Sequence, residues 1–325
     1  MDIFIGGAAF AVAALCALTM GFAIQRGATC TVAAVDELFA QRRASRLLAL
    51  LEASLWVSGG LLIAQRLGWL AHPPAGHPLG GWTVAGAALL GLGAFVNRAC
   101  VFGAIARLGS GEWAYVATPL GFYLGCLSVG TLFSPPQGPS PGSVVLGASA
   151  PVALLLSWAV AGWFAFRVVP PLLRHRRGLR ALLTQHLWSP HAATGVIGIA
   201  FVVMLLLVGA WAYTDALAEL AAGMARSLTA RWLLALCLLA GALLGGWTAG
   251  RFRPTAPRPA ALLRCVTGGV LMGWGSLLIP GSNDGLILIG MPLGWPYAWV
   301  AFATMCLVIA TAMAVQRRFT QRPAV

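Results

Sequence analysis

The chain has 325 residues, of which 59% are hydrophobic and only 9% are charged. A soluble protein carries about 25% charged and about 45–50% apolar residues, so this composition excludes an ordinary soluble domain. A helix that crosses a bilayer needs about 20 apolar residues. The hydrophobic positions therefore suffice for several spans, and the sequence predicts an all-α polytopic membrane protein.

The formal net charge is +13, and all 21 basic residues are Arg. Most of them lie in short clusters between apolar runs, a distribution that fits the orientation of membrane spans by cytoplasmic Arg rather than nucleic-acid binding. The four clusters are Arg42, Arg43 and Arg46; Arg167, Arg174, Arg176, Arg177 and Arg180; Arg251, Arg253, Arg258 and Arg264; and Arg317, Arg318 and Arg322.

In chain order, the apolar runs predict nine transmembrane helices. They cover residues 3–24, 47–66, 83–97, 113–133, 145–166, 192–213, 231–249, 262–279 and 294–316. Nine spans with the N-terminus outside and the C-terminus in the cytoplasm place all four Arg clusters on the cytoplasmic side. We therefore expect a multi-pass protein of the cell inner membrane in this orientation.

Three segments between these spans are apolar but too short to cross a membrane, and each contains Gly, Pro or Arg: residues 25–40, 98–112 and 280–293. Irregular backbone at membrane depth is tolerated only inside protein or beside a watery cavity, and interrupted segments in two halves of a transporter point to its binding site. We expect an N-terminal half at 1–166 and a C-terminal half at 191–325. A basic cytoplasmic connector at 167–190 would join them.

The three interrupted segments contain a repeat that aligns without gaps. Its copies are GFAIQRGATCTVA at 21–33, GLGAFVNRACVFG at 91–103 and GWGSLLIPGSNDG at 273–285. Each begins with small residues that let helices approach closely in lipid. Each places Cys30, Cys100 or Ser282 at the same position. These three residues are candidates for binding a substrate.

Cys30 and Cys100 each follow an intramembrane Arg, at Arg26 and Arg98. An ionisable residue within the membrane usually marks a pathway or a partner, and an adjacent Arg could favour a thiolate or attract an anion. The alternative is that each Arg extends from a helix end to the lipid headgroups. A further structural pairing is possible, because Glu52 could form an ion pair with one of the two.

The third copy has Ser282 at the position of the cysteine, within the segment Pro280-Gly281-Ser282-Asn283-Asp284. Pro280 should end the preceding helix, and the polar residues after it can cap a following short helix whose N-terminus faces anions. Asp284 would oppose anion binding unless it is protonated or paired. Ser282 and Asn283 are the candidate contacts in this copy.

The motifs GFAIQRGATCTVAAV, GLGAFVNRACVFGAIARLGSGE and GGVLMGWGSLLIPGSNDGL resemble those of the YeeE/YedE family of membrane proteins, whose studied members take up thiosulfate. The resemblance covers most of the chain. It implies nine transmembrane helices plus short membrane-inserted helices, in pseudo-symmetric halves around a constriction. In that family, cysteines line the constriction and pass the anion by transient hydrogen bonds.

The resemblance implies that Cys100 is the central contact, with Cys30 and Ser282 on either side. Ser282 departs from the family, in which characterised members have a third cysteine. A thiosulfate or related sulfur-anion transporter is the function implied, and a selenium-compound transporter is an alternative because relatives with an asparagine-aspartate motif are linked to selenium metabolism. The family also implies a TusA-like cytosolic sulfur-carrier protein as a partner, which the connector 167–190 could bind.

Two functions from other classes were weighed. A membrane thiol enzyme or sulfur-transferase would use Cys30 and Cys100, but the chain has no C-x-x-C motif and no His near either cysteine, so we expect no enzyme activity. A purely structural subunit would use the 13 Trp as anchors, although interfacial belts explain Trp equally. We expect no metal and no cofactor, because the five His have no ligand spacing.

Overall fold

The computed structural model describes residues 7–70, 74–133, 141–147, 150–174, 188–223 and 228–320. Within these residues every extended regular element is a helix, and the β-type contact is a single isolated bridge between Glu112 and Thr255. The all-α polytopic class predicted from composition is confirmed. The connector predicted at 167–190 falls partly outside the described residues, which omit 175–187.

The N-terminal part of the chain alternates long helices with short ones. In order, it contains α1 (Gly7–Gly27), α2 (Thr31–Gln41), α3 (Ser45–Arg66), α4 (Gly81–Asn97), α5 (Val101–Gly109), the 3-10 helix η1 (Trp113–Val116), α6 (Ala117–Leu132) and α7 (Ala150–Arg174). The short helices α2 and α5 follow α1 and α4 after breaks of three residues. These breaks lie within the predicted interrupted segments.

The C-terminal part repeats this alternation. It contains α9 (Pro190–Val208), α10 (Tyr213–Ala221), α11 (Leu228–Thr248), α12 (Pro259–Leu278), α13 (Asn283–Gly285), the π-helix η2 (Leu286–Gly290) and α14 (Pro296–Thr320). The predicted span 192–213 is wrong at its end, because α9 stops at Val208 and a separate helix, α10, begins at Tyr213. Gly209, with a φ of +83°, allows this break.

Eight helical stretches among the described residues are long and apolar enough to cross a membrane. They are Gly7–Gln41, Ser45–Arg66, Gly81–Gly109, Trp113–Leu132, Pro190–Val208, Thr229–Thr248, Pro259–Leu278 and Pro296–Phe319. Two of these stretches run through a break, because α2 continues the apolar stretch of α1 and α5 continues that of α4. The remaining predicted span, 145–166, overlaps the 25-residue helix α7, which packs on α3.

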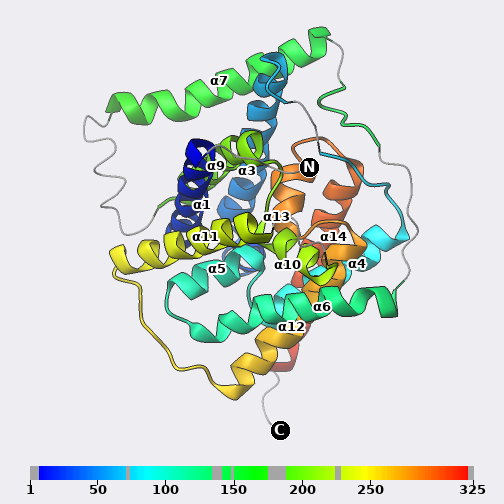
Figure 1. The fold of residues 1–325 in the computed structure, drawn as a ribbon. Coiled ribbons are helices and arrows are strands. Elements are labelled where there is room, and N and C mark those ends of the chain that lie inside the picture. The colour runs from blue at the N-terminus through cyan, green and yellow to red at the C-terminus, as the bar shows by residue number, and fades with distance from the viewer. Residues whose placement is uncertain are drawn as a thin grey trace.

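The long helices pack in a reciprocal pattern (Figure 1). Helix α1 packs against α9 and α11 while α9 also packs against α3, and α12 packs against α4 and α6 while α4 also packs against α14. The short helices follow the same rule: α2 packs on α3 and α14, and α10 packs on α11 and α6. In Figure 1, α10 and α13 lie in the middle of the bundle.

Glycines make the closest helix crossings possible. A Cβ atom at Gly21, Gly91 or Gly273 would collide with the backbone oxygen of the facing helix. These are the residues that open the three repeat copies, so this part of the repeat serves packing between helices rather than chemistry. Small residues allow such approach where lipid gives no hydrophobic drive for helices to associate.

Candidate functional site: the broken helices and the basic vestibule

The three repeat copies have the same backbone structure at the break. In each, an amide bonds to the carbonyl five residues earlier: Thr29 to Ile24 (3.1 Å), Ala99 to Ala94 (3.1 Å) and Gly281 to Ser276 (2.7 Å). This bond ends a helix by satisfying one of its last carbonyls. The gapless sequence repeat is therefore a repeated helix ending.

After each break, the residue at the shared position of the repeat has an extended backbone and directly precedes a short helix. Cys30, Cys100 and Ser282 are the N-cap residues of α2, α5 and α13, and their side chains make no capping bond to those helices. Their carbonyls accept the first helical bonds, from Ala34 (2.9 Å), Ala104 (2.8 Å) and Leu286 (2.9 Å). The two thiols therefore lie at helix N-termini, but they make no capping hydrogen bond to the helices that they precede.

The structure brings the two predicted thiols into contact. Cys100 Sγ lies 3.7 Å from Cys30 Sγ, and the Thr31 amide donates to Cys100 Sγ at 3.2 Å. Cys100 is fully buried, whereas Cys30 is partly exposed. Gly103 makes room for the pair, because a Cβ there would lie 2.5 Å from Cys30 Sγ.

Asn283 connects the third copy to the other two. Its Oδ1 accepts from the Val101 amide at 3.4 Å, and its Nδ2 donates to Thr31 Oγ1 at 3.4 Å. Val101 and Thr31 are the first residues of α5 and α2, and Asn283 itself is fully buried. One amide side chain therefore joins the starts of three short helices.

Ser282 lies in a separate polar cluster that includes a residue of α10. Thr214 Oγ1 is 3.1 Å from Ser282 Oγ, and it is 3.2 and 3.1 Å from the two carboxylate oxygens of Asp284. Ser282 also donates to Asp284, whose Oδ1 accepts from the Gly285 amide at 3.0 Å. The neighbouring Tyr213 hydroxyl donates to the Val101 carbonyl at 3.1 Å, so α10 is tied to α5 as well.

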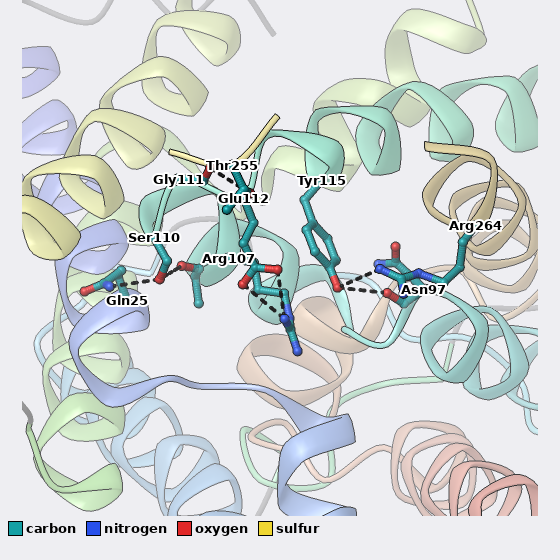
Figure 2. Close-up of polar contacts among 10 residues, drawn as sticks. Gln25, Asn97, Arg107, Ser110, Gly111, Glu112, Tyr115, Thr255 and Arg264 are labelled. Carbon is teal, nitrogen blue, oxygen red and sulfur yellow. Dashed lines mark hydrogen bonds and ion pairs between the residues drawn. The ribbon is translucent and has the colours of Figure 1, made fainter. Parts of the chain in front are cut away.

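A vestibule of about 760 Å³ opens beside Cys30. Five Arg line it against two acidic residues: Arg46, Arg98, Arg107, Arg251 and Arg253, with Asp36 and Glu112. Figure 2 shows part of its wall, where Arg107 contacts both oxygens of Glu112 at 3.1 and 3.0 Å and Gln25 donates to Ser110 at 3.3 Å. Because cations outnumber acids, this vestibule attracts anions toward Cys30.

The two predicted Arg residues have different surroundings. Arg98 is exposed, caps α4 with a φ of +60° and lines the vestibule. Arg26 is 1% exposed, donates to Thr248 of α11 at 2.8 Å and lies over the Phe22 ring. Arg26 does not belong to the vestibule lining. Glu52 contacts His191 Nδ1 at 2.5 Å, a partner on α9 that sequence spacing did not predict.

Two parts of the site were missed by the sequence analysis. The first is the fourth break, at residues 209–212, which places Tyr213 and Thr214 beside the repeat. Gly209 followed by Thr214 and Asp215 was the available signal, since these residue types favour helix ends and starts. The second is Arg107, on α5, which the span pattern did not distinguish.

Broken helices that meet inside a bundle of apolar spans, beside a cavity whose lining has a net positive charge, define a membrane transporter by architecture. The comparison with known families agrees: the model of the sulphur transport family matches residues 26–311. The chain therefore belongs to the sulphur transport family, and the resemblance to YeeE/YedE proteins is confirmed. It is a multi-pass membrane transporter of sulfur compounds.

Among curated proteins, the chain is similar to the thiosulfate transporter TsuA of Escherichia coli (strain K12). The two are 24% identical over 334 residues, and the alignment covers 92% of each chain. The match thus extends over the whole bundle and over all four helix breaks.

Proposed function

We propose that this protein transports thiosulfate or a related small sulfur-containing anion across the inner membrane, past Cys30 and Cys100. The contact between these two thiols, beside a basic vestibule and among the N-termini of short helices, carries the proposal. The thiosulfate transporter of Escherichia coli, similar over 92% of its length, supports the substrate class.

The chemistry of the thiols suits such an anion. A dianion leaves water only if donors replace its hydration, and a conducting site must bind weakly enough to release. A thiol is a weak, polarisable donor that matches a terminal sulfur. The amides at the start of α2 and α5 and the vestibule Arg can hold the oxygen-bearing end, since helix N-termini favour anions.

In this proposal, Cys100 is the central contact and Cys30 faces the vestibule. Ser282 and Asn283 stand on the opposite side, and Arg98 draws the anion to the vestibule; Arg26 keeps α1 against α11. Ser282 supplies a hydroxyl where characterised relatives have a third thiol. The Asn283-Asp284 pair makes a selenium-containing anion the alternative substrate, and a competition assay with selenium analogues distinguishes the two.

The orientation proposed places the N-terminus outside and the C-terminus in the cytoplasm. The vestibule then opens to the cytoplasm, because Arg46, Arg251 and Arg253 belong to clusters that the positive-inside rule assigns there. We also propose that residues 1–166 and 191–325 are pseudo-symmetric halves, which the reciprocal packing supports. A TusA-like sulfur-carrier protein would bind at the connector 167–190.

Uptake by cells that lack other thiosulfate importers tests the role of Cys100. We expect the Cys100→Ala variant, at wild-type membrane levels, to lose growth on thiosulfate, because the buried thiol that contacts Cys30 is removed. Cys126→Ala is the matched control, since Cys126 is also buried but lies inside α6 and not at a helix break. Wild-type growth of Cys100→Ala would contradict the proposal.

The pair of thiols also fits a membrane sulfur-transferase, so a second experiment separates the two functions. We expect maleimide labelling of Cys30 to be slowed by thiosulfate, with no sulfur left on the protein after the anion is removed. A labelled sulfur that remains on Cys30 or Cys100 and is released by a reductant would instead show an enzyme intermediate.

A further inference from the structure

The carboxylate of Asp284 is buried in the middle of the bundle, beside the proposed pathway. Asp284 is 3% exposed, and it borders a cavity of about 20 Å³ that lies between α1, α5, α10 and α11. A cavity of this size holds about one water molecule. Asp284 is the neighbour of Asn283, which contacts the starts of the two cysteine-bearing helices.

The contacts among Ser282, Thr214 and Asp284 can be counted in protons. Three pairs of residues are in contact through their oxygen atoms: Ser282 with Asp284, Thr214 with both carboxyl oxygens of Asp284, and Thr214 with Ser282. A hydrogen bond within each of the three pairs needs one proton, but the two hydroxyls supply only two. A carboxyl proton on Asp284 completes the ring, with Asp284 donating to Thr214, Thr214 to Ser282 and Ser282 to the other carboxyl oxygen.

The groups around Asp284 supply no compensating positive charge among the residues described. The cavity side chains of α1, α11 and η2 are apolar, at Met20, Ile24, Leu238 and Leu288. Helix α5 contributes Phe102 and Ile105 to the cavity, with the Cys100 thiol at its start. Helix α10 contributes Tyr213 to the cavity, and it carries a second acidic residue, Asp215, close to Asp284. The Arg231 side chain of α11 pairs with Glu219 at 2.8 Å.

An anion that passes an ionised carboxylate in such surroundings would be repelled, because like charges interact strongly where water is excluded. A protonated carboxyl is neutral, so it does not repel the anion. We propose that Asp284, with Ser282 and Thr214, is a proton-binding site that couples passage of the sulfur anion to transfer of a proton in the same direction. This inference rests on the proposed function and adds that a proton gradient drives the transport.

Proteoliposomes with labelled thiosulfate test the coupling, with the membrane potential held at zero by potassium and valinomycin. We expect the wild-type protein to acidify the lumen during thiosulfate entry, as an enclosed pH dye reports. For one proton per anion, an inward gradient of one pH unit should raise accumulation about tenfold. Counterflow exchange without a pH gradient measures transport itself and so tests the proposed function separately.

The variant Asp284→Asn should keep counterflow, because the amide mimics the neutral carboxyl, but lose both the acidification and the response to the gradient. Asp215→Asn is the matched control, and it should keep the response. The inference is overturned if net thiosulfate entry by the wild-type protein proceeds without acidification of the lumen. It is equally overturned if Asp284→Asn responds to the gradient like the wild type, or if Asp284→Asn abolishes counterflow.

Discussion

Cys30 and Cys100 differ from the other five cysteines of the chain in their backbone position. They occupy N-caps at helix breaks, whereas Cys16, Cys126, Cys237, Cys265 and Cys306 lie within helices. A cysteine inside an apolar helix behaves as a small hydrophobic residue. An N-cap position instead places the thiol at the start of a helix, beside its backbone amides, and this position fits the anion contact proposed for these two thiols.

At this scale, Gly103→Ala tests whether the position of the Cys30 thiol matters. The added methyl would displace Cys30 Sγ, which would lie 2.5 Å away, and so separate it from Cys100. We expect uptake to fall by at least about tenfold, since a displacement of about 1 Å at a positioned contact can cost this much or more.

The control for this variant is a double-mutant cycle. If Gly103→Ala acts through the thiol, it should have little further effect in a Cys30→Ala background. Equal losses in both backgrounds would show that the methyl disturbs the fold of α5 instead.

At the scale of elements, the sequence repeat has two separable parts. The opening glycines allow the helices to cross closely, and the later residues form the helix ending and the N-cap. The first part allows close packing in the bundle, and the second positions the side chains that we propose contact the substrate. Helix α1 packs between α9 and α11, and helix α12 packs between α4 and α6, so both parts of the repeat have a similar packing environment around α1 and around α12.

Substitution of Gly241 tests the packing role. A Cβ on Gly241 of α11 would collide with the backbone carbonyl of Leu18 on α1, and backbone atoms cannot move aside as side chains do. We expect Gly241→Ala to lower the unfolding temperature of the detergent-purified protein, with a cost of roughly 1–3 kcal/mol or more, as overpacking usually has.

Gly130→Ala is the matched control in α6, because a Cβ at Gly130 would meet nothing within 4 Å. Ala favours helices over Gly by about 1 kcal/mol, so this variant should be as stable as the wild type or slightly more stable. Similar unfolding temperatures for Gly130→Ala and Gly241→Ala would contradict the packing role.

At the scale of the whole molecule, charge is distributed unequally around the pathway. Arg gathers in the vestibule beside Cys30, whereas the innermost cluster holds Asp284 with hydroxyl groups. In the proposed mechanism, an anion is attracted to the vestibule from water and meets neutral donors further in. The vestibule would then raise the local concentration of anions, and the contacts at the helix breaks would select among them.

Vestibule charge can be tested with Arg98→Gln and Arg253→Gln. An exposed charge contributes roughly 0.2–1 kcal/mol, so the KM for thiosulfate offered on the vestibule side should rise about 1.4-fold to fivefold in each variant. Added salt should raise the KM of the wild-type protein more than the KM of the variants, because the variants have less vestibule charge for salt to screen.

Arg66→Gln serves as the control, since Arg66 is exposed at the end of α3 and is not part of the vestibule lining. It should leave the KM unchanged. A similar rise in KM for Arg66→Gln would indicate that net charge, rather than the vestibule, draws the anion.

The sequence by itself determined the membrane class, the three breaks and the two thiols. These features depend on local properties: apolar length sets a span, and Gly, Pro and Arg mark where a helix ends. The break after Val208 was missed because the apolar run continues to Tyr213, and only the Gly209 backbone separates α9 from α10.

Only the tertiary structure decided which side chains meet. Cys30 and Cys100 lie 70 residues apart, as do Thr214 and Asp284, and their contacts exist because the starts of α2, α5, α10 and α13 meet. The same packing placed Arg98 in the vestibule and Arg26 against Thr248, although their sequence contexts are alike. Hydrogen bonds that end a helix are local, whereas the direction a side chain faces is set by neighbouring helices that are distant in sequence.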